Sequence, residues 1–409
     1  MSDHLQLAFV SFYKGAYIIV EGKQNADCFF IIRQGRVRIS KEVEVVREED
    51  ILGPGDFFGV ISTMSGHSHI ETAQALTNVT LIAVQRDQYS QLIQDNTPVA
   101  MKIILQFSKR MRYLDESLTQ LTLKSSTEND PSILFKIGEY YARQNQYNLA
   151  FYAYNQYVKY NPAGQDVGAA RTRMMKIVPY VKGLTLSFKK DEAIRNYPKD
   201  TMIFSEGETG DELYIIQKGS VKIVKIMDDK EMLLAVLRIG DIFGEMAVLE
   251  SKPRAASAIA YEDCQILAIN RVNFTLMISV QPQIVARLTI LLADRIWFIY
   301  KQLANTLLSD PLGRIYDALQ IQLEKNRVSL KSSSSFTFDF GPNELANMVG
   351  LSQGDGAKIF RKLLENRNFL VVKDKLYIVN VSEVVRQAEY YRKIQSRSDK
   401  TRSAGSQRD

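Results

Sequence analysis

Residues 243–257 hold the side chains of this sequence that are best suited to binding a small anion. The segment reads Phe-Gly-Glu-Met-Ala-Val-Leu-Glu-Ser-Lys-Pro-Arg-Ala-Ala-Ser. Gly244 and its small neighbours let backbone amides point into a cavity, as an anion-binding nest requires. Arg254 supplies a guanidinium that can bind two phosphate oxygens, and Glu245 supplies an acceptor suited to a sugar hydroxyl. In isolation, such a Glu and Arg are more often a surface pair.

Signals for catalysis or metal binding are weak. The three histidines are His4, His67 and His69, and no cysteine lies at ligand spacing from the His67-x-His69 pair. Two polar loop residues are the favoured interpretation of that pair. The sequence has no Walker-type phosphate loop and no Gly-x-Ser-x-Gly elbow. We therefore predict no catalytic residues, no metal site, no required cofactor and no enzymatic activity.

Length and composition predict an intracellular protein with several domains. The chain has 409 residues, of which 45% are hydrophobic and 24% charged, as is typical of globular proteins. No run of about 18 apolar residues occurs, so we expect no membrane-spanning helix, and residues 1–12 do not resemble a signal peptide. The two cysteines fit a reducing cytoplasm. The net charge of +6 carries little weight as a sign of an anionic partner.

Three blocks of sequence occur twice, which predicts two copies of one domain. Residues 14–22 match 199–207, residues 29–39 match 213–223, and residues 55–59 match 240–244. The blocks keep their order, and their offset is 184 or 185 residues. Each copy is rich in Ile, Val, Phe and Tyr and is interrupted by Gly and Asp, which predicts an antiparallel β-barrel.

A long helix opened by a proline, Pro98 or Pro282, is expected after each copy. The second helix carries an apolar stripe at steps of three and four: Leu288, Leu292, Ile296, Ile299, Leu303 and Leu307. We favour a homodimer seam over residues 282–308, and packing on its own barrel would explain part of the stripe.

Residues 131–164 have the spacing of a tetratricopeptide repeat, whose period is about 34 residues. The matching positions are Gly138, Tyr141, Ala150, Tyr154 and Pro162. A single repeat cannot bury its own face, so it should pack on a helix over residues 166–180 or on a barrel. A helical spacer between the barrels is an equally good interpretation.

Residues 243–257 resemble the phosphate-binding cassette of the cyclic-nucleotide-binding domain family, and the likeness covers about residues 190–308. The resemblance implies that Glu245 binds the ribose 2′-hydroxyl and that Arg254 pairs with the cyclic phosphate. Ala255, where a Thr tends to favour cyclic GMP, favours cyclic AMP. The predicted ligand set is Gly244, Glu245, Met246, Ala247, Arg254, Ala255, Ala256 and Tyr300.

The first copy departs from the cassette. Val60 stands where Glu245 does and His69 where Arg254 does. Because a buried phosphodiester without a cation is costly, we expect no cyclic nucleotide there in the usual pose. A structural or dimerising role is favoured over a different ligand.

The long second helix and the hinge after it resemble those of the Crp/Fnr family. The matching residues are Pro282, Arg287, Leu288, Asn305, Asp310, Gly313 and Arg314. In the cyclic-AMP-dependent members, adjacent small hydroxyl residues on this helix bind the adenine. Ile299 and Tyr300 occupy those places here, and Tyr300 could still donate a hydrogen bond or stack.

The C-terminal residues predict a winged helix-turn-helix. A helix from Ser309, a Ser-rich hairpin over residues 329–340 and two further helices precede a hairpin wing over residues 371–379. Ala346, Gly350, Ile359 and Leu363 fit the packed positions of the motif.

The predicted DNA-binding residues lie at the recognition helix and the wing. They are Ser352, Gln353, Lys358, Arg361, Lys362, Lys373 and Lys375. Gln can read adenine and Lys can read guanine. Gly354 has no side chain with which to read a base, and Gly354 and Gly356 each cost a helix about 0.8–1 kcal/mol. A winged domain kept for protein contact is the alternative.

The predicted fold is α+β multidomain, with two antiparallel β-barrel (jelly-roll) domains of the cyclic-nucleotide-binding type. The segments are 1–96 (degenerate barrel), 97–128 (long helix), 129–182 (tetratricopeptide-like linker), 183–281 (nucleotide-binding barrel), 282–308 (dimerisation helix), 309–385 (winged helix-turn-helix) and 386–409 (basic tail, helical at first and then disordered).

The leading hypothesis is a homodimeric bacterial transcription regulator that binds double-stranded DNA in response to a cyclic nucleotide, cyclic AMP in preference to cyclic GMP. RNA polymerase or another protein is a further candidate partner, and no membrane partner is expected. The alternative is a cyclic-nucleotide sensor that acts through protein partners without specific DNA binding.

Overall fold

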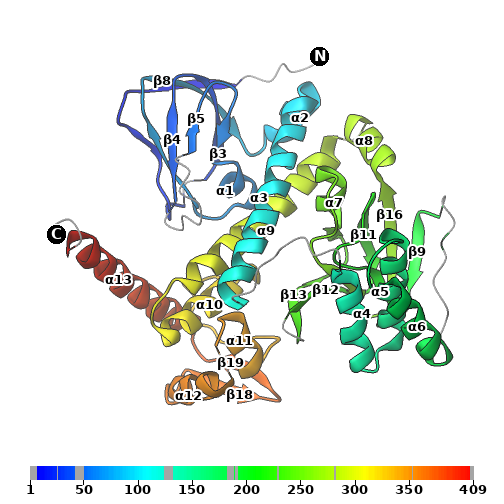
Figure 1. Cartoon of the computed structure of the whole chain (residues 1–409). Coiled ribbons are helices and arrows are strands. Elements are labelled where there is room, and N and C mark those ends of the chain that lie inside the picture. Colours follow the sequence, from blue (N-terminus) through cyan, green and yellow to red (C-terminus); the bar gives the residue numbers. More distant parts are fainter. Residues whose placement is uncertain are drawn as a thin grey trace.

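The computed structural model describes residues 7–24, 26–41, 50–123, 132–181, 188, 192–227, 230–280, 282–351 and 353–405. Figure 1 shows two β-sheet domains, a group of short helices on the second of them, and a C-terminal unit reached by a long central helix. Within the described residues, no helix is both long and apolar enough to cross a membrane.

The first domain is a sandwich of two four-stranded antiparallel sheets, in the orders β1-β8-β3-β6 and β2-β7-β4-β5. Its strands are β1 Ala8–Phe12, β2 Tyr17–Ile19, β3 Cys28–Gln34, β4 Val37–Ser40, β5 Asp50–Leu52, β6 Phe57–Phe58, β7 Thr72–Ala75 and β8 Val79–Gln85. Its short helices are α1 Val60–Ser65 and α2 Tyr89–Asp95. Inward residues such as Ile32, Val37 and Leu81 form the core between the sheets, because alternate side chains of a strand point to one face.

The second domain repeats this topology, with sheets in the orders β9-β16-β11-β14 and β10-β15-β12-β13. Its strands are β9 Ile194–Tyr197, β10 Met202–Phe204, β11 Glu212–Lys218, β12 Val221–Met227, β13 Lys230–Leu237, β14 Ile242–Phe243, β15 Ser257–Ala260 and β16 Cys264–Asn270. Its helices are α7 Glu245–Glu250 and α8 Arg271–Val280. The structure confirms the internal repeat. The prediction of a closed barrel is wrong for the described strands: the strands divide into separate sheets that pack face to face, an arrangement that produces the same alternation along each strand.

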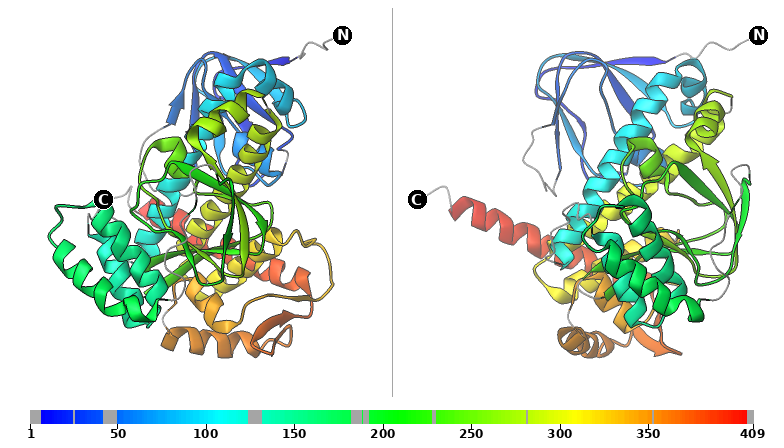
Figure 2. Two further views of the ribbon diagram at one scale, coloured as in Figure 1. Left: turned by 90° about the vertical axis from the view of Figure 1, so that its right-hand side faces the viewer. Right: turned by 45° about the vertical axis from the view of Figure 1, so that its right-hand side comes forward.

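The long helices α3 Thr97–Leu123 and α9 Pro282–Thr306 pack along one another. Both begin at the upper end of the molecule in Figure 1 and run down through its centre, so they point in the same direction. The views in Figure 2 keep them side by side. A single hydrophobic cluster joins α3 and α9 to the short helices of both domains.

The apolar stripe of α9 is therefore covered within the chain. Leu288, Leu292, Ile296 and Leu303 are buried against α1, α2 and α3 of the first domain. Leu307 lies beyond the end of α9 and is 50% exposed. This corrects the predicted homodimer seam over residues 282–308, because the apolar surface that a second copy would need already has a partner.

The helices between the domains are α4 Ile133–Arg143, α5 Tyr147–Tyr160 and α6 Val167–Ile177, followed by a 3₁₀ turn, Val178–Tyr180. α4 and α5 form a hairpin in which Gly138 makes room for a ring: a Cβ there would lie 2.6 Å from the Tyr154 ring. Their apolar face packs on Met202, Val224 and Ile259 of the second domain. The hairpin thus buries its face on a sandwich, one of the partners that the sequence suggested.

The C-terminal unit consists of α10 Pro311–Lys325, β17 Phe336–Thr337, α11 Pro342–Met348, α12 Gln353–Leu364, β18 Phe369–Val372, β19 Lys375–Ile378 and α13 Val381–Gly405. The strands form one sheet in the order β17-β19-β18. The hairpin predicted over residues 329–340 is wrong, because its one strand pairs with β19 and not with a neighbour in that segment. The tail, predicted to begin as a helix and to end in disorder, is helical through Gly405, and residues 406–409 lie outside the described residues.

Hydrogen bonds fix the junction between α9 and this unit. Asn305 Nδ2 donates to the Arg314 carbonyl at 2.7 Å and to Asp317 Oδ2 at 2.9 Å. Arg392 of α13 donates through Nε to Asp317 Oδ1 at 2.5 Å. Asp317 is buried, so its carboxylate depends on these donors. The end of α9 is consequently joined to α10 and α13 by hydrogen bonds.

Candidate ligand-binding site

Arg254 lies at the centre of the second-domain cassette, defined as residues 243–257. Its side chain is buried, and its guanidinium donates through Nη1 to the Gly244 carbonyl at 2.6 Å and through Nη2 to the Glu212 carbonyl at 2.8 Å. The guanidinium carbon lies 4.2 Å from the centroid of the Phe204 ring. Nε is buried and, among the described residues, has no hydrogen-bond partner. A buried donor without a partner is costly, so this position is suited to a ligand that brings an acceptor.

Glycines make room for that guanidinium. A Cβ at Gly210 would lie 2.3 Å from Arg254 Cζ, and one at Gly244 would lie 2.7 Å from Nη1. Gly244 also has φ +74°, and it precedes the first residue of α7. Because glycine adopts positive φ at little cost, the turn can aim the start of α7 at Arg254. The local sequence thus explains why the cassette folds around its arginine.

Glu245, the first residue of α7, is 2% exposed and pairs with α9. Its Oε1 lies 3.1 Å from Arg295 Nη1, and Arg295 also donates to the Ile242 carbonyl. Asp115 of α3 lies close enough to this pair for its carboxyl to interact electrostatically with both Glu245 and Arg295. Burial raises the pKa of the Asp115 carboxyl to about 6, although Lys225 and Arg295 act to lower it. The predicted sugar-binding carboxylate is therefore linked directly to the long helix.

The helical hairpin reaches the cassette through a second buried carboxylate. Tyr152 of α5 donates to Glu208 Oε2 at 3.1 Å, and the Ser205 amide donates to the same oxygen at 3.1 Å. The Glu208 carbonyl accepts the Arg254 amide at 2.8 Å. Burial raises the pKa of Glu208 to about 7 despite these donors and the nearby charge of Arg254. The hairpin thus contacts the residue next to the cassette arginine.

Replacing Glu208 with Gln should remove a pH dependence of stability. The pKa of Glu208 rises from 4.5 to about 7 on folding, so the folded state holds a proton that the unfolded chain releases. The free energy of unfolding should therefore fall as pH rises from about 4.5 to about 7, by at most about 3 kcal/mol from this group. Urea midpoints should fall over this range in the parent and stay flatter in Glu208→Gln. An exposed control, Glu365→Gln, should keep the parental slope, and an unchanged slope in Glu208→Gln would contradict the assignment.

The first-domain cassette, residues 58–72, keeps the backbone arrangement of the second but has Val60 and His69 in place of Glu245 and Arg254. His69 pairs through its backbone with Gly22 and Lys23, as Arg254 does with Gly207 and Glu208. This confirms the alignment of His69 with Arg254.

The carboxylate of Glu71 lies inside this first cassette. Its Oε1 accepts the Gly59 amide at 2.8 Å, and the side chain is buried. The second domain has Ala256 at the position of Glu71. In the first cassette, the carboxylate of Glu71 thus occupies the Gly59 amide at the start of α1.

The other predicted ligand-binding residues fall into two groups. Ala247 is buried, and Met246, Ala255 and Ala256 are half-buried along the cassette. Tyr300 lies at the first domain: its hydroxyl donates to Glu21 Oε1 at 2.8 Å. Tyr300 was predicted to face the nucleotide in the second domain. Because this bond holds its hydroxyl at the other sandwich, we remove Tyr300 from the proposed ligand set.

His67 joins the first domain to α9 and shows no sign of a metal site. Its Nε2 lies 3.0 Å from Asp294 Oδ1, and its ring stacks on Trp297 with centroids 4.1 Å apart. The described residues contain no group of three or more His, Cys, Asp or Glu side chains placed to hold a metal ion. Asp294 and Arg295 therefore reach the first and second cassettes from adjacent positions of one helix.

The predicted DNA-binding residues gather on α12 and the β18–β19 turn. Lys358, Arg361 and Lys362 are exposed on α12, and Lys373 is exposed in the turn with φ +50°. Lys375 pairs with Asp339 at 2.8 Å. Ser352 lies outside the described residues, and Gln353 is the first residue of α12. The structure thus places the cations of both predicted segments on one unit.

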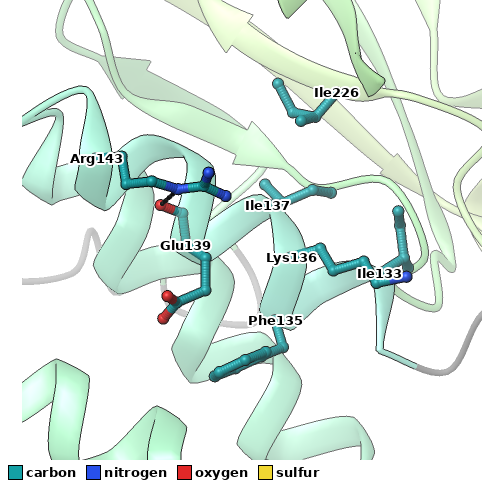
Figure 3. A pocket seen from close by; sticks show the side chains of 7 residues that line it. All are labelled: Ile133, Phe135, Lys136, Ile137, Glu139, Arg143 and Ile226. Carbon is teal, nitrogen blue, oxygen red and sulfur yellow. Dashed lines mark hydrogen bonds between the residues drawn. The ribbon is translucent and has the colours of Figure 1, made fainter. Parts of the chain in front are cut away.

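A shallow hollow of about 430 Å³ lies beside α4 (Figure 3). Ile133, Ile137 and Ile226 form its apolar part, and Arg143 donates to the Glu139 carbonyl at its edge. The hollow is lined by residues of α4 and by Ile226 of β12, and no residue of the cassette lines it, so we assign it no part in the ligand site.

Comparison with known proteins relates the two sandwiches to one family. The cyclic nucleotide-binding domain family matches residues 9–96 and 194–280. The cAMP-activated global transcriptional regulator CRP of Escherichia coli is 30% identical over 188 residues, which are 46% of this chain and 89% of that protein. Its namesake from Pasteurella multocida is 32% identical over 188 residues, with the same coverage of each chain. A solved structure of the c-di-GMP responsive global regulator CLP of Xanthomonas campestris covers 46% of this chain and 93% of its own, with 21% identity and a TM-score of 0.38.

Proposed function

Because this chain belongs to the Crp/Fnr family of transcription regulators, we propose that it binds double-stranded DNA under the control of a cyclic nucleotide in its second domain. The observation that carries the proposal is the buried Arg254 guanidinium, whose Nε has no hydrogen-bond partner among the described residues, beside the buried carboxylate of Glu245. A cyclic nucleotide offers a phosphate to the first group and a ribose hydroxyl to the second.

The proposed ligand is cyclic AMP. Its phosphate would accept from Arg254 and from the amides of the small residues Ala255 and Ala256, and its 2′-hydroxyl would donate to Glu245. The choice of base rests on Ala255, where a hydroxyl side chain would favour cyclic GMP, and on the cyclic AMP dependence of the Escherichia coli and Pasteurella multocida relatives.

The proposed signal passes through Glu245 and Arg295. A ribose hydroxyl on Glu245 would change the pairing of that carboxylate with α9, which is 3.1 Å long in the described state. α9 is joined at its far end to α10 and α13 through Asn305 and Asp317. A ligand can shift such an equilibrium only if it binds the two arrangements with different affinity. A change in the contact between Glu245 and Arg295 would supply such a difference.

The C-terminal unit is proposed to be a winged helix-turn-helix. α11 and α12 are joined by a turn in which Gly350 has φ +68°, and β18–β19 forms the wing. α12 would enter the major groove, where Gln353 and Lys358 could contact base edges. Arg361, Lys362 and Lys373 would contact phosphates. Ser352 remains the proposed cap of α12, and Lys375 a second contact from the wing.

Lys358→Glu should abolish specific DNA binding and leave the ligand affinity unchanged. Lys358 is exposed on α12. The change replaces a cationic hydrogen-bond donor with a carboxylate, which has the same sign of charge as the DNA phosphates. A lost base contact alone is worth about 1–3 kcal/mol, or a fall in affinity of about 5- to 150-fold, and the repulsion of the new carboxylate by the phosphates adds to this loss. Electrophoretic mobility shift on DNA selected by the parent protein measures the first effect, and calorimetry with cyclic AMP the second.

The control is Lys176→Glu, which makes the same change of charge on the exposed end of α6. It should keep the parental affinity for both DNA and ligand. If the parent protein binds cyclic AMP but enriches no DNA sequence, the alternative of a sensor that acts through protein partners is favoured.

A further inference from the structure

The two long helices exchange the same contact between the two domains. Position 112 of α3 and position 297 of α9 are 185 residues apart, as are positions 68 and 253 after the two cassette helices. Arg112 Nη1 donates to the Pro253 carbonyl at 3.3 Å, and Trp297 Nε1 donates to the Ser68 carbonyl at 2.9 Å. Each long helix therefore donates to the cassette of the other domain from an equivalent position. Such reciprocity is the mark of a two-fold interface.

The packing has the same reciprocity. α3 packs on α7 of the second domain, and α9 packs on α1 of the first. Residues 185 positions apart are buried together along the two helices. These pairs are Ile103 with Leu288, Phe107 with Leu292, and Met111 with Ile296. The residues that repeat in the sequence thus also make equivalent contacts at the interface. The two domains are therefore related to each other as the two subunits of a two-fold dimer are.

The two halves of this internal pair are not equivalent in chemistry. The second half has Arg254 and Glu245, whereas the first has His69 and Val60 at the same places. In the first half, the Gly59 amide donates to the Glu71 carboxylate. The described residues contain one α11–α12 unit, which follows α9, whereas the next described element after α3 is α4 of the hairpin. The pair therefore combines two unlike halves. The first lacks the two polar ligand anchors, and the second carries both the proposed ligand site and the C-terminal unit.

We propose that this chain forms its two-fold pair internally and acts on DNA as a monomer, at a single half-site without a palindromic partner. The part concerning DNA rests on the function proposed above. A homodimer with two identical reading units requires two half-sites related by symmetry. One reading unit on an internally paired molecule requires one half-site, and the apolar stripe that would join two copies is already buried.

Light scattering after size-exclusion chromatography tests the internal pairing without DNA. We expect the mass of one chain, 46.5 kDa, at micromolar protein concentrations, with and without cyclic AMP. A stable mass of two chains would overturn the proposal whether or not the protein binds DNA.

Selection from a random duplex library tests the DNA site. We expect an enriched motif without two-fold symmetry and a complex of one chain per duplex, and doubling the motif into a palindrome should not raise the affinity per site. A palindromic motif bound by two chains would overturn the inference and leave the proposed function intact. Failure to enrich any sequence would instead overturn the DNA-binding function, and with it the half-site, while the mass measurement still decides the internal pairing.

Discussion

Arg254→Gln is expected to reduce the affinity for cyclic AMP by at least about 100-fold. The buried guanidinium is held by two backbone carbonyls, and its Nε is unpartnered among the described residues. A hydrogen bond to a charged group is worth about 1.5–3 kcal/mol, and leaving a buried phosphate without its cation costs more. Isothermal titration calorimetry with cyclic AMP and cyclic GMP measures the loss and identifies the preferred base.

The matched control is His69→Gln, at the equivalent position of the first domain. It should leave the binding isotherm unchanged, because the cassette there lacks the anchors for a phosphate. Arg254→Lys should recover part of the affinity, since an ammonium keeps the charge without the planar fork. Unchanged binding in Arg254→Gln would place the ligand elsewhere. If the parent protein binds neither nucleotide, the cassette serves another ligand or none, and the proposed regulation fails.

Trp297→Ala should lower the free energy of unfolding by about 3–5 kcal/mol, the range for removing a buried tryptophan. Trp297 is 1% exposed, stacks on His67 and donates to the Ser68 carbonyl at 2.9 Å. Truncation leaves a cavity between the first domain and α9 and an acceptor without its donor. Urea unfolding followed by far-ultraviolet circular dichroism measures the loss, and it avoids the fluorescence of the residue that is removed.

Trp297→Phe separates the two contributions. The ring and most of the volume remain, so we expect a loss of about 1–2 kcal/mol from the missing N–H donor and the smaller ring. A Trp297→Ala protein as stable as the parent would show that the first domain does not depend on α9, and it would argue against the internal pair. Both variants should fold at low temperature, which a native circular dichroism spectrum would verify.

The domains were predictable because their signals are local. Glycines that precede the cassette helices have positive φ in both copies, +80° at Gly59 and +74° at Gly244. Such positions tolerate few other residues, so they mark the same turn twice in the sequence. The departure of the first cassette was visible for the same reason, because Val60 and His69 fall at fixed distances from that turn.

Partners distant in the sequence were not predictable in the same way. An apolar stripe such as that of α9 indicates that it will be covered but not by what, and a homodimer was inferred where the chain supplies its own α3. Arg295 was missed because its partner Glu245 lies 50 residues away and no local pattern joins them. Tyr300 was predicted to contact the nucleotide because of its position in the long helix. Its hydroxyl instead donates a hydrogen bond to Glu21 of the first domain. The 185-residue offset could have predicted the equivalence of the two long helices, because it also relates Arg112 to Trp297.

The Glu71 carboxylate that fills the first cassette has a consequence for the shape of the dose response. A symmetric receptor with two competent sites can respond cooperatively, because occupation of one site favours occupation of the other. An internally paired molecule with one competent site has no second site to recruit. Saturation with cyclic AMP should therefore be hyperbolic, with one nucleotide per chain and a Hill coefficient of about 1. Such a regulator would grade its output over a wide range of nucleotide concentration and would not switch at a threshold.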